Sequence, residues 1–322
     1  MSDQADYATR RRRVSVKSIT EKRSSLVPAA DAPEGRRLND IWEILGYGGA
    51  VTARDLLLQE PPGMRRDRLL RFAERMVEGG FGENDDIAVA PATGQAREIL
   101  VIFSGSGYRF SVQHNMFERD DVHVVLIRDL KACFSMAGLQ GLGADYHASK
   151  LGLGDVLDAL STEEESTEEN RLPVHALGIS TGGYAALRFG LDMGFDRVTV
   201  FGGPGSIRLE DDDTASMERY PELVPIGHCA PEQIQSAIDL YKARNATLAR
   251  GAVGEGLPQV LTIHGELHER DARWSRGIGT IPGARVMELP GVDNHHVFNL
   301  LCANGQVREL VEPKPVIENV AA

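Results

Sequence analysis

Residues 178–182 read Gly-Ile-Ser-Thr-Gly and place Ser180 in the spacing G-x-S-x-G. This spacing is typical of a sharp turn between a strand and a helix, which exposes a serine hydroxyl for attack on a carbonyl carbon. Glycines suit the turn because they allow the strand and the helix to pack closely around a strained serine backbone. An apolar strand pattern over 174–179 precedes Ser180 and a helical pattern over 184–194 follows it, so the flanks support the prediction.

A serine nucleophile needs a base that accepts its proton. His295 and His296 follow the last predicted strand, where the base belongs when the serine lies in such a turn. His295 is the preferred base, because the run from it through Val297 into a helix resembles the usual passage from a catalytic histidine. His296 is the alternative.

The base in turn needs an acid that orients it, and the chain order should be serine, acid, histidine. Three carboxylates follow the predicted strand 258–266: Glu266, Glu269 and Asp271. The position that usually carries the acid holds His268 instead, so Asp271 is the first choice in a slightly longer loop. Glu266 is second and Glu269 third, and all three also fit the ordinary pattern of exposed loop carboxylates.

The tetrahedral intermediate of such a reaction needs two backbone N–H groups aimed at its oxyanion. Thr181, the residue after the nucleophile, is expected to supply one of them. Ser106 or Gly107, in the glycine-rich segment after the first core strand, is expected to supply the other. A plain turn at the end of the strand is the alternative interpretation of that segment. The segment lacks the G-x-G-x-x-G spacing of a phosphate loop.

These residues need a scaffold, and strands alternate with helices from residue 98 onward. Near-continuous apolar runs of this kind are typical of parallel strands buried on both faces. We therefore expect an α/β fold with a mostly parallel central sheet flanked by helices. The predicted strands cover 98–107, 122–130, 174–180, 196–203, 258–266 and 284–291, and the predicted helices 146–160, 184–194 and 231–249.

The remaining segments suggest a three-part organisation. Residues 1–37 are polar and basic and are expected to form a disordered tail. Residues 38–92 are expected to form a helical hairpin, with helices 38–60 and 64–79 separated by a Pro-Pro-Gly sequence. The core domain covers 96–315, and its insert 203–257 is either a cap over the site or a decorated surface loop.

Composition narrows the classes of partner. The chain has 322 residues and a formal net charge of −12, which argues against nucleic acid. It contains no apolar run near the ~20 residues of a transmembrane helix and no apolar segment behind Arg10–Arg13 that would make a signal peptide. Its three cysteines are far apart, so we expect reduced thiols, a cytoplasmic location and no metal site.

The chain resembles the α/β-hydrolase superfamily over roughly residues 96–312. The resemblance depends on the GISTGG turn, the late His295, the acidic loop between them and the strand order. It is similar in detail to bacterial hydrolase-like domains with an Arg-Asp pair after the second core strand (Arg128-Asp129), a GLxGLG segment (138–143) and a GGYAALRFG helix. The resemblance implies a serine nucleophile, an acyl-enzyme intermediate, hydrolysis by water and no cofactor.

The leading hypothesis is a serine hydrolase that cleaves a carboxylic ester or thioester of a small-molecule or acyl substrate. One alternative is an acyltransferase that uses the same three residues and an alcohol or amine in place of water. Another is a catalytically idle hydrolase fold that serves as a binding module, an idea to which His268 in the acid position lends some support. The sequence specifies neither the substrate nor the oligomeric state.

Overall fold

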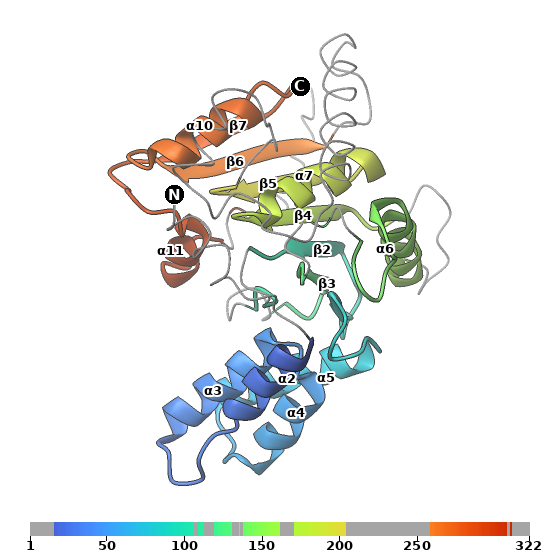
Figure 1. The fold of residues 1–322 in the computed structure, drawn as a ribbon, viewed down its shortest axis with the longest axis vertical. Helices are drawn as coiled ribbons and strands as arrows, with labels where there is room; N and C mark the ends of the chain where they lie inside the picture. The colour runs from blue at the N-terminus through green and yellow to red at the C-terminus, as the bar shows by residue number, and fades with distance from the viewer. Residues whose placement is uncertain are drawn as a thin grey trace, which may run out of the picture.

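The computed structural model describes residues 16–105, 109–112, 119–130, 135, 138–161, 171–203, 258–307 and 310. Its centre is a seven-stranded sheet in the order β1-β3-β2-β4-β5-β6-β7 (Figure 1). β1 pairs antiparallel with β3, and the other pairings are parallel. The strands are β1 (Ile87–Ala90), β2 (Glu98–Phe103), β3 (Val122–Ile127), β4 (Val174–Ile179), β5 (Arg197–Phe201), β6 (Gln259–Gly265) and β7 (Arg285–Leu289).

Helices cover both faces of this sheet, which confirms the predicted fold class. Along β2, Leu100 and Ile102 face a core shared with α3, α4, α5 and α11. Val101 and Phe103 face the opposite core, shared with α6, α7 and α10. The described helices are α2 (Val16–Ser25), α3 (Glu34–Gly46), α4 (Ala50–Gln59), α5 (Met64–Glu78), α6 (Tyr146–Ser161), α7 (Gly182–Met193), α10 (Glu269–Ile278) and α11 (Val297–Ala303). None of them is long and apolar enough to cross a membrane.

The six predicted strands are all present, and the structure adds β1. This strand has four residues, all buried. Four residues give too few positions for a strand pattern to stand out from the surrounding loops, so the sequence analysis missed it.

Residues 16–37, expected to belong to a disordered tail, contain α2 and the start of α3. Ile19 is 1% exposed. The Arg23 guanidinium is buried and donates hydrogen bonds to the Glu83 carbonyl oxygen (2.8 Å) and to Asn84 Oδ1 (3.1 Å). The prediction was wrong for these residues, because Arg23 is buried and makes hydrogen bonds to residues far away in the sequence, which a local pattern does not show. Residues 1–15 lie outside the described residues.

The expected helix 38–60 is two helices, α3 and α4, separated by a tight turn. Gly48 has φ +84°, and a Cβ at this position would lie 2.7 Å from the Glu83 carbonyl oxygen. The turn therefore requires glycine, and the predicted hairpin is a group of three helices, α3, α4 and α5 (blue, Figure 1). These helices share one hydrophobic core with β2 and β3. The expected cap insert and its helix 231–249 fall on 204–257, outside the described residues.

The GLQGLG segment packs beside β1 through a buried carboxylate. Asp86 accepts hydrogen bonds from the backbone N–H groups of Leu130 (3.1 Å) and Gln140 (2.8 Å), and its own N–H donates to the Gln140 carbonyl oxygen (2.8 Å). Burial raises the pKa of Asp86 to about 6, with a further rise from Asp129, against the lowering effects of these hydrogen bonds and Arg128.

We expect this carboxyl group to make stability depend on pH. In the unfolded chain Asp86 ionises near its ordinary pKa of 3.8, whereas in the folded chain it retains the proton to about pH 6. Between these values the folded state binds more protons, so stability falls as pH rises, by about 3 kcal/mol in total. The Asp86→Asn variant should lack this component. Urea unfolding from pH 4 to 7 would contradict the assignment if the two proteins gave parallel curves.

Candidate active site

Ser180 lies in the turn between β4 and α7, with a left-handed backbone at φ +51°. This conformation is uncommon for a residue with a side chain and needs support from its surroundings. The Ser180 N–H donates to the Phe201 carbonyl oxygen of β5 (2.9 Å), and the Gly183 N–H donates to the Ser180 carbonyl oxygen (2.8 Å). The strained backbone is thus fixed on both sides.

The flanking glycines are required by close backbone approach. A Cβ on Gly178 would lie 2.5 Å from the Gly183 Cα atom, and one on Gly182 would collide with the carbonyl oxygens of Phe103 and Ser104. The strand before Ser180 and the helix after it therefore pack against each other and against β2 without intervening side chains.

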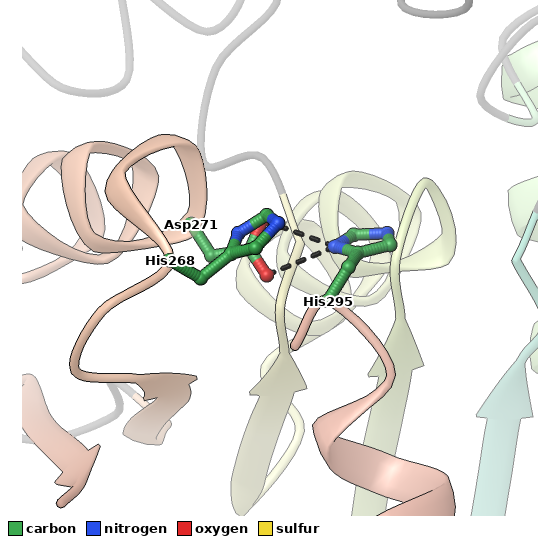
Figure 2. A group of neighbouring side chains, drawn as sticks. All are labelled: His268, Asp271 and His295. Carbon is green, nitrogen blue, oxygen red and sulfur yellow. Dashed lines mark hydrogen bonds and ion pairs between the residues drawn. The ribbon is translucent and has the colours of Figure 1, made fainter. Parts of the chain in front are cut away.

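The structure brings Ser180, His295 and Asp271 into one chain of hydrogen bonds. The Ser180 hydroxyl lies 2.7 Å from His295 Nε2. His295 Nδ1 lies 3.0 Å from Asp271 Oδ1 and 2.9 Å from Oδ2 (Figure 2). With the imidazole proton on Nδ1, His295 donates to the carboxylate and leaves Nε2 to accept the serine proton. The His295 side chain is 18% exposed, whereas Asp271 is fully buried.

Asp271 reaches His295 from a helix that the sequence analysis interpreted as a loop. α10 begins at Glu269, which puts Asp271 in the first helical turn. The positive end of the helix dipole favours a carboxylate there. The two alternative acids are exposed: Glu269 is in the same turn, and Glu266 accepts a hydrogen bond from the Gly291 N–H (2.7 Å).

His295 lies in the segment between β7 and α11, and aromatic rings surround it. Trp274 of α10 meets it edge-on, with ring centroids 6.4 Å apart. The His268 ring stacks on it at 5.6 Å with an interplanar angle of 29°. His296, the alternative base, is exposed and stands at the start of α11, with its N–H bonded to Asn294 Oδ1 (2.8 Å).

The expected oxyanion donors are only partly within the described residues. Thr181 is the first residue before α7, so its N–H belongs to the amino end of that helix. Ser106 and Gly107 lie outside the described residues. Gly105, just before them, contacts the turn that carries Ser180: a Cβ on it would lie 3.1 Å from the Ile179 carbonyl oxygen and 3.2 Å from the Ser180 Cβ.

Helix α3 makes hydrogen bonds and an ion pair with residues 109–112, which follow Gly105 in the chain. Trp42 Nε1 donates to the Val112 carbonyl oxygen (3.0 Å), and the Phe110 N–H donates to the Gly46 carbonyl oxygen (2.8 Å). Arg109 pairs with Glu43 at 2.7 Å. Helix α3 therefore holds residues 109–112 of the segment after β2, and Gly105 of the same segment lies against the Ser180 turn.

These contacts predict that a change in Trp42 of α3 affects the reactivity of Ser180. Trp42→Phe keeps an aromatic ring but removes the donor to Val112, so unfolding free energy should fall by about 1 kcal/mol. Acylation of Ser180 by a fluorophosphonate should slow about 3- to 10-fold, because the loop loses its alignment. Tyr146→Phe is the matched control, since it removes a hydrogen bond to Asp192 (2.7 Å) on the other side of the sheet. Equal labelling rates in both variants would contradict the coupling.

The sequence analysis did not single out Gly202, which follows β5 with φ +55°. A Cβ at this position would lie 2.8 Å from Asp271 Oδ2 and 2.9 Å from the His295 carbonyl oxygen. The absence of a side chain at Gly202 therefore provides the space in which Asp271 and His295 contact each other. The Gly-Gly pair at the end of a predicted strand was the available signal.

Comparisons with known proteins identify similar solved structures. No protein-family model matches the chain, and no curated protein sequence matches it. A capsule O-acetyltransferase of Neisseria meningitidis serogroup A is 10% identical, with 68% of this chain and 92% of that chain covered and a TM-score of 0.44. S-formylglutathione hydrolase from Staphylococcus aureus is 11% identical, with 69% and 89% covered and a TM-score of 0.40. Dienelactone hydrolase from Anabaena variabilis is 15% identical, with 70% and 88% covered and a TM-score of 0.39.

These similarities are too low to assign a family, and the fold class depends on the structure itself. The sheet is mostly parallel, with a serine turn after a central strand and the segments that carry Asp271 and His295 after β6 and β7. That order of strand, serine, acid and histidine defines an α/β-hydrolase fold.

Proposed function

We propose that this protein is a serine hydrolase that cleaves a carboxylic ester or thioester through an acyl-enzyme intermediate. The observation that carries the proposal is the hydrogen-bonded chain from Ser180 through His295 to the buried Asp271. A serine hydroxyl is a poor nucleophile at neutral pH, and this arrangement supplies both the base and the group that orients it.

The geometry supports a reaction in two steps. Ser180 Oγ attacks the substrate carbonyl carbon while His295 Nε2 accepts the hydroxyl proton. Asp271 holds the Nδ1–H tautomer and stabilises the imidazolium that forms. His295 then gives the proton to the leaving alcohol or thiol, which leaves Ser180 acylated. In the second step, water that gives a proton to His295 attacks the acyl carbon, and His295 returns that proton to Ser180 Oγ as the carboxylic acid leaves.

The N–H of Thr181 and one N–H from Ser106 or Gly107 are the proposed donors to the tetrahedral oxyanion. Thr181 is supported by its place at the amino end of α7. The loop after β2 is supported by the contact of Gly105 with the Ser180 turn. Such donors contribute about 3 kcal/mol each to transition-state stabilisation in related chemistry.

Fluorophosphonate labelling followed by intact-mass measurement tests the proposal. Wild-type protein should gain one adduct, and peptide mapping should locate it on Ser180. Ser180→Ala and His295→Ala should lose the adduct, whereas Ser24→Ala, which changes an exposed serine of α2, should keep it. A folded wild-type protein without adduct would overturn the hydrolase and leave the binding-module alternative.

Hydrolysis and acyl transfer differ in the second step, where water competes with an alcohol or amine. A screen of ester and thioester substrates should therefore give carboxylic acid at the same rate with and without added acceptors. Product formation that requires an acceptor would instead identify an acyltransferase with the same three residues.

We also propose a cytoplasmic location with reduced thiols and a small acyl compound, not nucleic acid, as the partner. Cys302 supports the thiol state, because its side chain is buried and burial raises the pKa of the thiol to about 12. The net charge of −12 supports the exclusion of nucleic acid. Mass-spectrometric counting of alkylated cysteines in protein taken directly from cells tests the thiol state.

A further inference from the structure

His268 stands just before α10 and shares the carboxylate that orients His295. Its Nδ1 atom lies 3.2 Å from Asp271 Oδ1. This nitrogen is buried and has no hydrogen-bond partner among the described residues. Figure 2 shows the His268 ring and the Asp271 carboxylate on the side of His295 that bears Nδ1. A buried ring nitrogen that lies beside a carboxylate but makes no hydrogen bond is an available ligand position.

The three side chains together have the donors and spacing of a metal site. His268, Asp271 and His295 each offer one ligand atom, and these atoms lie within 4.8 Å of one another. Two ligands of a tetrahedral Zn²⁺ ion lie about 3.3 Å apart, given metal–ligand distances near 2.0–2.1 Å. Asp271 Oδ1 already lies 3.2 Å from His268 Nδ1 and 3.0 Å from His295 Nδ1. The two nitrogens lie within 4.8 Å of each other, so only a small approach of the rings is needed for both to bind one ion.

We propose that His268 Nδ1, the Asp271 carboxylate and His295 Nδ1 form an inhibitory site for Zn²⁺, with water as the fourth ligand. Two imidazoles and a carboxylate suit zinc, whereas Mg²⁺ prefers oxygen ligands. Arg270 Nε lies 3.6 Å from Asp271 Oδ1, and its guanidinium stacks over Trp274 at 5.0 Å. This positive charge weakens cation binding and makes the site a reversible one.

Zinc at this site would stop the proposed reaction through a shift of the His295 ring proton. The ion binds the lone pair of His295 Nδ1, so the single ring proton moves from Nδ1 to Nε2 through solvent, with no net release. Nε2 then carries a proton and can no longer accept the one from the Ser180 hydroxyl. The ion also removes Asp271 from its role toward the histidine. This inhibitory consequence depends on the proposed function, whereas the binding site itself does not.

Isothermal titration of the untagged full chain with zinc chloride tests the site directly. Wild-type protein should bind one ion, and His268→Gln should raise Kd at least about tenfold, since even outer-sphere partners of metals contribute that much. His296→Gln is the matched control, because His296 is exposed and its ring lies 5.5 Å from that of His295. It should bind like wild type, and magnesium chloride should give no binding heat.

Thermal unfolding shows whether each variant is folded and, in the same experiment, whether zinc stabilises it. Zinc should raise the Tm of wild type and of His296→Gln, and at the same concentration it should raise the Tm of His268→Gln and of a second variant, His268→Asn, by less. Absence of one-to-one zinc binding to wild type, or equal affinity in folded His268→Gln, would overturn the site.

Fluorophosphonate labelling in the presence of zinc tests the inhibition. Zinc should slow labelling of wild type, a chelator should restore it, and His268→Gln should need at least about ten times more zinc for the same fractional slowing. Binding with an unchanged labelling rate would overturn the inhibitory role. Failure of labelling without zinc would instead overturn the proposed function, and the titration would still decide the metal site.

Discussion

Asp271→Asn should lower kcat for ester hydrolysis about 10⁴-fold and leave KM nearly unchanged. An asparagine keeps the size of the side chain but removes the charge that stabilises the imidazolium. Its amide can also donate to Nδ1, which favours the tautomer with the proton on Nε2, and that tautomer cannot act as the base. The expected loss is large because Asp271 is fully buried and contacts His295 through both carboxylate oxygens (2.9 and 3.0 Å).

Glu266→Gln and Glu269→Gln are the controls that separate the three candidate acids. Glu269 is exposed in the same helical turn, and Glu266 is exposed and bonded to the Gly291 backbone. Each change removes one negative charge near the site without touching the His295 hydrogen bonds, so kcat should stay within about threefold. Steady-state kinetics on purified proteins check this. An Asp271→Asn enzyme with wild-type kcat would remove Asp271 from the mechanism.

The strands β2 and β3 could be predicted from the sequence because burial on both faces leaves little choice of residue. β2 and β3 are fully buried along their length, so they read as continuous apolar runs. β1 satisfies the same condition, but its four residues are too short to show it.

α10 could not be predicted by apolar periodicity, because polar residues occupy its buried face. Its buried residues include Asp271 and Ser275 beside Ala272 and Ile278. Ser275 is satisfied by a hydrogen bond with Thr262 of β6 (2.9 Å). The polar members of this face are held by partners far away in the sequence, and a local pattern contains no information about them.

The same limit applies to the candidate site. Chain order pointed to Ser180 and to the His295–His296 pair, since the turn and the late histidine are local signals. The choice among Glu266, Glu269 and Asp271 depends on which carboxylate the helix turns inward, and that is a tertiary property. His268 stood out only as a departure from the usual acid position, and its contact with Asp271 needed the structure.

Gly202→Ala should lower kcat at least about 100-fold, although residue 202 carries no chemistry. The added methyl group would lie 2.8 Å from Asp271 Oδ2 and 2.9 Å from the His295 carbonyl oxygen. Relief of this overlap must move the carboxylate or the histidine. A displacement near 1 Å at a reacting group costs about 100-fold in rate. The left-handed backbone at φ +55° adds a stability cost of about 1 kcal/mol.

Gly194→Ala separates the backbone effect from the effect on the site. Gly194 also has a left-handed backbone, at φ +66°, but a Cβ there would have no neighbour within 4 Å. Both variants should lose about 1 kcal/mol of unfolding free energy, and only Gly202→Ala should lose activity. If both variants retained wild-type kcat, Asp271 and His295 would tolerate displacement. The proposal that Gly202 is needed to position them would then be wrong.

A double-mutant cycle identifies the partner through which Gly202 acts. If the methyl group acts by displacing Asp271, it has little left to damage once the carboxylate has been replaced. Gly202→Ala combined with Asp271→Asn should then have about the same kcat as Asp271→Asn alone, which is the non-additivity expected of residues in contact. Multiplication of the two losses would show that the methyl group acts elsewhere, on the His295 backbone or on the Ser180 turn.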